Sequence, residues 1–165
     1  MREWLVAGAL IEVDGAMLLV RNVRPSGHED WSTPGGVIDA DDSTLIDGLA
    51  REVEEETGLR VIDWEGPVYE VRADAVDLGW SLRVEVHRAL EFEGKLAVDD
   101  PDGIVVEAAF FTPERCRELL ADVAPWVREP LAEWMSERWG IDARRGYQYQ
   151  VHGTDRRSLD VRRAR

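Results

Sequence analysis

Residues 48–59 read GLAREVEEETGL and place four glutamates within five positions, directly behind Arg51. In a helix, like charges three or four residues apart each cost about 0.2–0.5 kcal/mol, so this crowding needs a physical reason. A run of this kind indicates either a solvated acidic surface or a site that uses the carboxylates together. The residues around it decide between the two.

Residues 43–57 predict a helix that carries these glutamates. Ser43 or Thr44 can cap its start, and Gly58 can end it in a left-handed conformation. The apolar positions recur at helical spacing and form one face, made of Leu45, Ile46, Leu49 and Val53. The helix therefore packs by one side and leaves its acidic residues at the edge of the packed face.

The helical repeat separates the glutamates into two groups. At about 100° per residue, Glu55 and Glu56 lie on either side of Glu52 within an arc of roughly 100°, whereas Glu54 lies nearly opposite. Arg51 is four residues before Glu55 and can pair with it. A ridge of three carboxylates suits Mg²⁺ or Mn²⁺, which would relieve the repulsion and accept substrate phosphate oxygens. On the ridge alone, a solvated acidic face is an equal alternative.

The segment 35–59, GGVIDADDSTLIDGLAREVEEETGL, resembles the signature of the Nudix hydrolases. That signature has a glycine, five residues, a glutamate, seven residues, and then Arg-Glu-apolar-x-Glu-Glu-x-Gly-apolar. Gly36 matches its glycine, and its second half matches at Arg51, Glu52, Val53, Glu55, Glu56, Gly58 and Leu59. Two departures occur: Asp42 replaces the first glutamate, and eight residues rather than seven follow it.

The resemblance covers residues 1 to about 140 and implies an α/β fold, a Nudix-type α/β/α sandwich with a mixed β-sheet. It implies that Glu52, Glu55, Glu56 and the carbonyl of Gly35 bind Mg²⁺ or Mn²⁺. It also implies that Glu52 and Glu55 serve catalysis and that Arg51 orients a glutamate. Metal ions neutralise a diphosphate and acidify water, and a nearby glutamate can take up the proton, so the residues agree with this chemistry.

The implied reaction is hydrolysis of a diphosphate linkage in a nucleoside diphosphate joined to another group. A nucleotide sugar, ADP-ribose and an ordinary or oxidised nucleoside triphosphate all fit as substrates. The alternative is a non-catalytic Nudix-fold module that binds a nucleotide or a partner protein. The intact set of three glutamates favours the enzyme.

Several weaker candidates lie outside the signature. Asp100, Asp102 or Glu107 could supply a further acid or base, although DDPDG at 99–103 is also an ordinary turn sequence. Trp31, in the turn-rich loop 24–36, could stack on a substrate, but a packing role is the stronger expectation. The alternating strand at 81–94 points Leu82, Val84, Val86, Leu90 and Phe92 one way.

The opposite face of that strand carries Arg83, Glu85 and His87 among other polar residues. These three could line a substrate pocket, but a solvated sheet face explains them equally well.

Composition sets the broad class of the protein. The chain has 165 residues, a formal net charge of −14 and the single cysteine Cys116. This charge disfavours nucleic-acid polymers and anionic membranes as partners. One cysteine excludes an internal disulfide and favours a cytoplasmic, reducing setting. The apolar run WLVAGALI at 4–11 is too short to span a membrane and predicts a buried strand rather than a signal peptide.

Two regions are expected along the chain: a Nudix domain at 1–143 and a basic extension at 144–165. The extension carries seven Arg and two Asp, so it has a net charge of +5 and leaves −19 on the rest. It predicts either a partly disordered, solvated tail or a segment that docks on an acidic surface, with a short strand at GYQYQV, 146–151.

Turn residues predict a hairpin at Asp14-Gly15, an apolar run predicts a strand at 104–111, and the proline in Thr112-Pro113 predicts the start of a helix. A last helix should end at Gly140, with Leu131, Trp134 and Met135 on one side. Trp139 joins that side if the helix continues to it. Its tryptophans, with Trp126, could form a homodimer interface or pack the core, and the sequence leaves the oligomeric state open.

Overall fold

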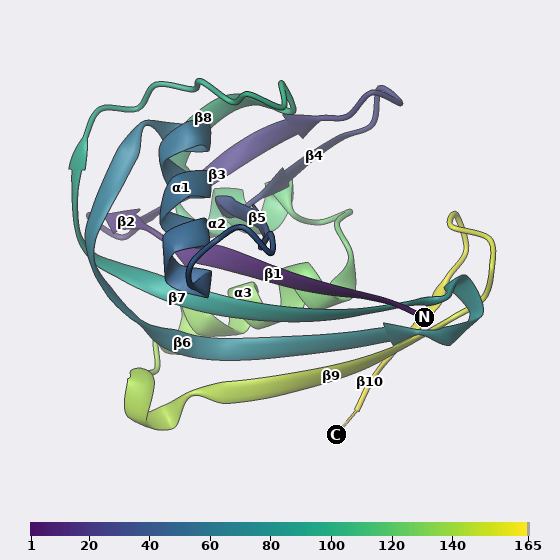
Figure 1. Ribbon diagram of the computed structural model, residues 1–165. Helices are drawn as coiled ribbons and strands as arrows, with labels where there is room; N and C mark the ends of the chain where they lie inside the picture. The colour runs from purple at the N-terminus through teal and green to yellow at the C-terminus, as the bar shows by residue number, and fades with distance from the viewer. Residues whose placement is uncertain (165) are drawn as a thin grey trace.

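The computed structural model describes residues 1–164, which form two β-sheets and three α-helices (Figure 1). The helices are α1 (Leu45–Thr57), α2 (Pro113–Leu119) and α3 (Pro125–Glu137), with short 3₁₀ turns at Val76–Leu78 and Ile141–Ala143. The strands are β1 (Arg2–Leu10), β2 (Glu12–Val13), β3 (Ala16–Val23), β4 (Glu29–Ser32), β5 (Gly35–Val37), β6 (Leu59–Ala75), β7 (Trp80–Gly94), β8 (Val105–Phe111), β9 (Arg145–His152) and β10 (Asp160–Arg163).

The larger sheet has the strand order β10-β9-β6-β7-β1-β5. It is mixed, because β1 runs parallel to β7 and β6 runs parallel to β9, while the other neighbours are antiparallel. In the smaller sheet β3 is central and pairs with β2, β4 and β8. The expected mixed α/β sandwich is confirmed.

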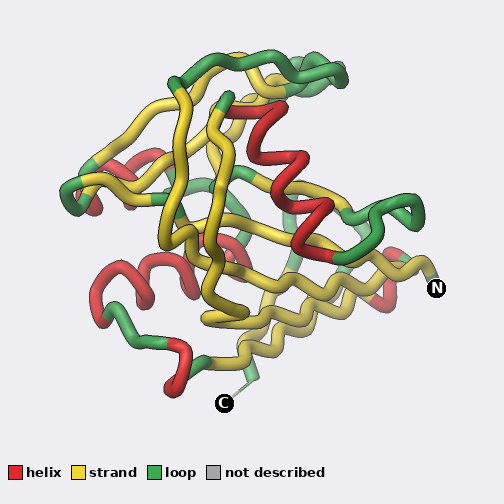
Figure 2. The backbone as a smooth tube through the Cα atoms, turned by 60° about the vertical axis from the view of Figure 1, so that its left-hand side comes forward, coloured by secondary structure: helices red, strands yellow, loops and turns green. Residues whose placement is uncertain are grey.

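Helices cover both faces of the sheets, and each face has its own hydrophobic core (Figure 2). Leu49 and Val53 of α1 pack on one face, against Ala7 and Ala9 of β1. The other face is covered by α2 and α3, and the residues buried there include Cys116, Leu131, Trp134 and Met135, with Leu120 directly after α2. This arrangement leaves the acidic edge of α1 beside the edge strand β5.

The Asp14-Gly15 turn joins β2 to β3 as a hairpin, with Asp14 and Gly15 at φ values of 51° and 81°. The apolar run before it is nevertheless divided. Its longer part is β1, which pairs with β7 in the other sheet. The loop expected at 24–36 is also more ordered than its composition indicates, because it contains β4 and the start of β5.

The C-terminal segment is part of the larger sheet rather than a solvated tail. Residues 145–150 of β9 pair in parallel with 69–74 of β6, and β10 pairs with β9. Its side chains also reach α3. Arg145 donates two hydrogen bonds to Glu137, Arg163 donates two to Glu133, and the Tyr149 hydroxyl donates one to Glu129. These contacts agree with the docking interpretation, with strand structure at 146–151 as expected.

The last helix is shorter than its sequence pattern indicates. It ends at Glu137, and Arg138 adopts φ of 50° where Gly140 was expected to end the helix. Trp134 and Trp139 are both buried in the core of their own chain, and the indole of Trp139 donates to the carbonyl of Val68. Core packing, rather than an interface, therefore accounts for these two tryptophans. No helix among residues 1–164 is long and apolar enough to cross a membrane.

Candidate active site

The helix that carries the glutamates begins and ends as the sequence predicts. Thr44 caps α1, because its hydroxyl accepts a hydrogen bond from the backbone N–H of Asp47. Gly58 ends the helix at φ of 77° and donates to the carbonyl of Glu54. Burial of Leu49 and Val53 then fixes the rotation of the helix, so that Glu52 and Glu56 face β5.

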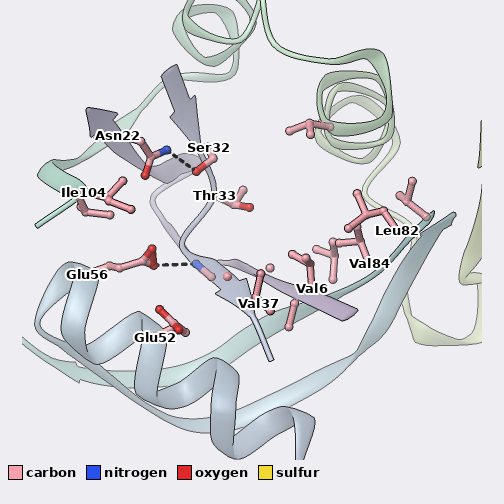
Figure 3. Close-up of a pocket in the computed structure, with 18 of the residues that line it drawn as sticks. Val6, Asn22, Ser32, Thr33, Val37, Glu52, Glu56, Leu82, Val84 and Ile104 are labelled. Atoms are coloured by element: carbon pink, nitrogen blue, oxygen red, sulfur yellow. Dashed lines mark hydrogen bonds between the residues drawn. The ribbon is translucent and has the colours of Figure 1, made fainter. Parts of the chain in front are cut away.

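A direct hydrogen bond ties α1 to β5: the backbone N–H of Gly35 donates to Glu56 Oε2 at 3.0 Å (Figure 3). Gly35 has φ of 146°, and a Cβ at this position would lie 2.0 Å from the carbonyl oxygen of Ala7. Only glycine allows so close an approach between β5 and β1. The predicted metal-binding residue Gly35 thus lies beside Glu56, where its N–H is engaged with the carboxylate.

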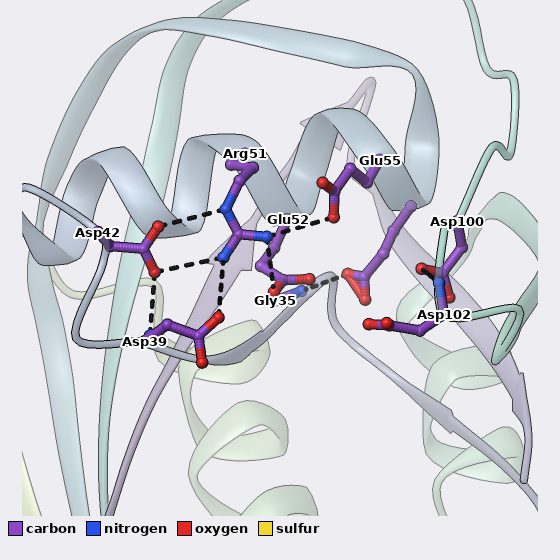
Figure 4. Close-up of polar contacts among 9 residues, drawn as sticks. Gly35, Asp39, Asp42, Arg51, Glu52, Glu55, Asp100 and Asp102 are labelled. Atoms are coloured by element: carbon purple, nitrogen blue, oxygen red, sulfur yellow. Dashed lines mark hydrogen bonds and ion pairs between the residues drawn. The ribbon is translucent and has the colours of Figure 1, made fainter.

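Arg51 connects the carboxylates into one network (Figure 4). Its Nε and Nη2 donate to the two oxygens of Asp42, each at 3.2 Å. Its Nη1 lies 3.3 Å from an oxygen of Glu52 and 3.3 Å from an oxygen of Glu55. The expected Arg51–Glu55 ion pair is present, and Arg51 reaches Glu52 as well.

Asp42 is the residue at which the sequence departs from the Nudix signature, and the structure gives it a clear place. Its carboxylate accepts the two hydrogen bonds from Arg51 and a third from the backbone N–H of Asp39. The hydrogen bond from Arg51 lowers the pKa of Asp42. The longer loop thus brings the shorter carboxylate of Asp42 to Arg51. Despite the departure from the signature, Arg51 is hydrogen-bonded to a carboxylate at this position.

Two glutamates in this network have a raised pKa: Glu56, which is buried, and Glu52, which is half-buried. Burial raises the pKa of Glu56 to about 8; the Gly35 hydrogen bond lowers it, and nearby Glu52 and Asp100 raise it. Burial likewise raises the pKa of Glu52 to about 7, although the charge of Arg51 acts in the opposite direction. Partial or full removal from water thus raises the pKa of both carboxyl groups above that of a solvated glutamate.

The donor chemistry of this cluster fits a hard divalent cation. Glu52 and Glu56 offer carboxylate oxygens beside a cavity, and a cation would offset their burial and mutual repulsion. Glu55 is turned toward Arg51. Within residues 1–164, no three His, Cys, Asp or Glu side chains are already arranged as a metal cage. The fitting residues are therefore Glu52 and Glu56, a partial set that a Mg²⁺ ion could complete with water and substrate oxygens.

A cavity of about 490 Å³ opens beside these two glutamates. Its other polar lining residues are Asn22, Arg24, Ser32, Thr33, Asp39, Asp100 and Asp102. The lining of β7 is apolar, and Figure 3 shows Leu82 and Val84 at the opposite end from Glu56. This volume lies within the range of small-molecule sites in proteins.

The hypothesis that Arg83, Glu85 and His87 line the pocket is wrong in its choice of strand face. None of the three lines the cavity, whereas their neighbours Leu82, Val84 and Val86 do. Because side chains alternate along a strand, the two sets lie on opposite faces of β7. Glu85 instead bridges Arg83 and His87, and His87 is buried rather than solvated.

Trp31 also lies away from the cavity lining. It packs edge-on against Phe111, with ring centroids 5.1 Å apart, which is the packing role expected for it.

The three acidic candidates outside the signature have different surroundings. Asp100 and Asp102 line the cavity, but the Asp100 carboxylate accepts hydrogen bonds from the backbone N–H groups of Asp102, Ile104 and Val105. Asp102 has no such bond among the described residues and is free to reach the site. Glu107 is paired with Arg21 on the smaller sheet and is absent from the cavity lining, so the structure does not bring it to the site.

Sequence reasoning assigned no role to Asp42 and left out the hydroxyls of Ser32 and Thr33 and the ring of Trp126. Asp42 had a usable signal in its place in the signature. The others had none, because the cavity is built from segments that are far apart in the sequence.

Comparison with known proteins agrees with this geometry. A family model described as NUDIX domain matches residues 1–135. A "MutT-like protein" of Streptomyces ambofaciens is 45% identical over 56 residues, which are 34% of this chain and 34% of that protein. The match thus spans about a third of the relative's length.

Solved structures share the fold over most of the chain. The ORF135 protein of E. coli is 25% identical with a TM-score of 0.65, over 84% of this chain and 92% of that one. An ADP-ribose pyrophosphatase of Streptococcus suis has a TM-score of 0.53 at 23% identity, over 87% and 98% of the two chains.

The matched family model spans β1 to most of α3 and includes Asp42, Arg51, Glu52, Glu55 and Glu56. The chain belongs to the Nudix family.

Proposed function

We propose that this chain is a pyrophosphohydrolase that uses a divalent metal, Mg²⁺ or Mn²⁺, to cleave a nucleoside diphosphate joined to another group. The proposal rests mainly on Glu52 and Glu56, two glutamates of raised pKa that line a cavity of about 490 Å³. Nudix hydrolases generally use divalent metals, and this pair supplies the oxygens that such a cation prefers.

The residues have separable tasks in this proposal. Glu52 and Glu56 hold the cation, which would neutralise the diphosphate and acidify a water molecule. Arg51 holds Glu52 and Glu55 in place and is itself held by Asp42. In this proposal Glu52, which lines the cavity, contacts the reacting groups. Asp102 lines the same cavity, its charge acts on Glu52, and it is the further acid or base that we favour.

The test is a substrate panel in Mg²⁺: ADP-ribose, NADH, nucleotide sugars, dinucleoside polyphosphates and nucleoside triphosphates, with chromatographic detection of products. Turnover of at least one anhydride is expected, together with a loss of at least about 100-fold in Glu56→Gln. Glu54→Gln is the matched control, because Glu54 is exposed on the same helix. Turnover that survives Glu56→Gln unchanged would refute the assignment of the site.

The contrasting proposal, a non-catalytic binding module, predicts tight binding of one member of the panel without turnover of any. A cytoplasmic location also belongs to our proposal and is supported by the single, buried and unpaired Cys116. A homodimer is the remaining partner proposal, and sedimentation of the purified chain tests it.

A further inference from the structure

The cavity beside Glu52 and Glu56 has a polar end and an apolar end. The charges of Asp102 and Asp100 act on Glu52 and Glu56, respectively, and Figure 3 shows Leu82 and Val84 at the far end from Glu56. The apolar end is lined by Val6, Tyr69, Val71, Leu82, Val84, Val86, Trp126, Val127 and Leu131. Within this apolar end, only Tyr69 and Trp126 carry a polar side-chain atom. A ligand that spans the cavity therefore meets carboxylates at one end and an almost wholly apolar chamber at the other.

The floor of the apolar end is a continuous patch of the larger sheet. Val84 of β7 is flanked in register by Val6 of β1 and by Val71 of β6. Val86 is flanked in the same way by Gly8 and Tyr69. Because Leu82, Val84 and Val86 alternate on one face, the floor runs for about 13 Å from the glutamate end.

The wall opposite this floor comes from α3. Trp126, Val127 and Leu131 face the sheet across the cavity, and Trp126 packs edge-on against Trp80 with ring centroids 5.9 Å apart. Three strands and one helix thus enclose a space with aromatic groups on two sides. A flat aromatic ring fits such a space by shape and by contact with the rings.

The junction between the two ends of the cavity is formed by Gly8 and the hydroxyl group of Thr33. Gly8 pairs with Gly35 on one side and with Val86 on the other, so it separates the glutamates from the floor. A Cβ on Gly8 would lie 3.2 Å from the hydroxyl oxygen of Thr33, which places that hydroxyl at the junction. A sugar between phosphate and base would place its own hydroxyls there, whereas a hydrocarbon chain has none.

We propose that the apolar end takes the aromatic base of a nucleotide by shape and stacking, without reading the hydrogen-bonding edge of the base. The proposal rests on the proposed function and deepens it: the enzyme requires a base but distinguishes poorly among bases. A site built to hydrogen-bond its substrate can reject an analogue by 10⁴-fold or more, whereas an apolar pocket reaches only about 10- to 200-fold. This chain has the second kind of pocket.

The first experiment measures kcat/KM for ATP, GTP, CTP and UTP beside ribose 5-triphosphate, which carries no base. We expect the four nucleotides to agree within about 100-fold. Loss of the base should lower kcat/KM by about 10- to 100-fold, the value of one stacked base. Preference for one base by more than about 1,000-fold, or equal turnover of the abasic compound, would overturn the proposal.

Calorimetric binding separates this proposal from the hydrolase activity. AMP, GMP, CMP and UMP have no anhydride to cleave, and ribose 5-phosphate is their abasic match. Similar affinities for all four, each above that of ribose 5-phosphate, support the apolar chamber even if no anhydride is turned over. Tighter binding of geranyl diphosphate than of any nucleotide would assign the chamber to a hydrocarbon chain and overturn the proposal.

Variants locate the effect at the chamber. Trp126→Ala should raise KM for the nucleotides about 10-fold, leave kcat within about twofold, and leave the abasic compound unaffected. Trp126→Phe keeps an aromatic ring and should restore most of the loss. Trp64→Ala is the matched control, because Trp64 is a partly buried tryptophan in the other hydrophobic core. Equal effects of Trp126→Ala on the abasic compound and the nucleotides would indicate a purely structural role.

Discussion

Glu56→Gln should stabilise the metal-free protein while it removes activity. Glu56 is only 6% exposed, and its pKa is raised from 4.5 to about 8. A carboxyl group whose folded pKa is raised keeps its full stability below its unfolded pKa and loses it as the pH rises toward the folded pKa. Glutamine has no charge to bury and can still accept the hydrogen bond from the Gly35 N–H.

The magnitude follows from the same two pKa values. Each pKa unit is worth about 1.4 kcal/mol, so the shift of the Glu56 pKa from 4.5 to about 8 lowers the free energy of unfolding by about 4 kcal/mol at pH 7.5 and by about 1.5 kcal/mol at pH 5.5. Glu56→Gln should therefore raise the free energy of unfolding, and by about 2–3 kcal/mol more at pH 7.5 than at pH 5.5.

Urea unfolding in EDTA at the two pH values measures this difference. Glu54→Gln is the control, since Glu54 is exposed and its substitution should change stability by less than about 0.5 kcal/mol. A gain that is the same at both pH values, or a loss of stability at pH 7.5, would refute the reasoning. Mg²⁺ should then stabilise the wild type more than Glu56→Gln, because the variant lacks one ligand.

Three further predictions concern other parts of the structure. Asp42→Asn should lower kcat about 10-fold through misplacement of Arg51, with little change in circular dichroism, whereas Asp39→Asn, whose carboxylate lies 3.8 Å from Arg51, should change kcat less than twofold. Burial lowers the pKa of His87, so wild-type stability should fall as the pH drops below about 6.5; His87→Asn should flatten that part of the Tm-against-pH curve, and an unchanged slope would contradict the assignment. EDTA should abolish turnover, and Mg²⁺ or Mn²⁺ should restore it; full activity after exhaustive chelation would contradict a metal-dependent reaction.

The sequence alone determined the local parts of this protein. Helix α1 followed from its cap, its apolar stripe and Gly58, all of which act within a few residues. The convergence of Glu52, Glu55 and Glu56 followed from the helical repeat, and the family followed from the spacing around them. These features depend on short-range geometry, which the order of residues fixes directly.

The tertiary structure decided what depends on contacts between distant segments. Polar and apolar side chains alternate along β7, and this pattern does not say which face of the strand borders the cavity. Only the packing of α1 and α3 shows that Leu82 and Val84, not Arg83 and Glu85, line it. The charge of the segment after residue 143 fitted both a free tail and a docked strand, and its pairing with β6 and α3 selected the strand. Asp42 gained its place only when the longer loop brought it to Arg51. Chain order fixes which groups are near neighbours, and burial of apolar surface fixes which distant groups meet.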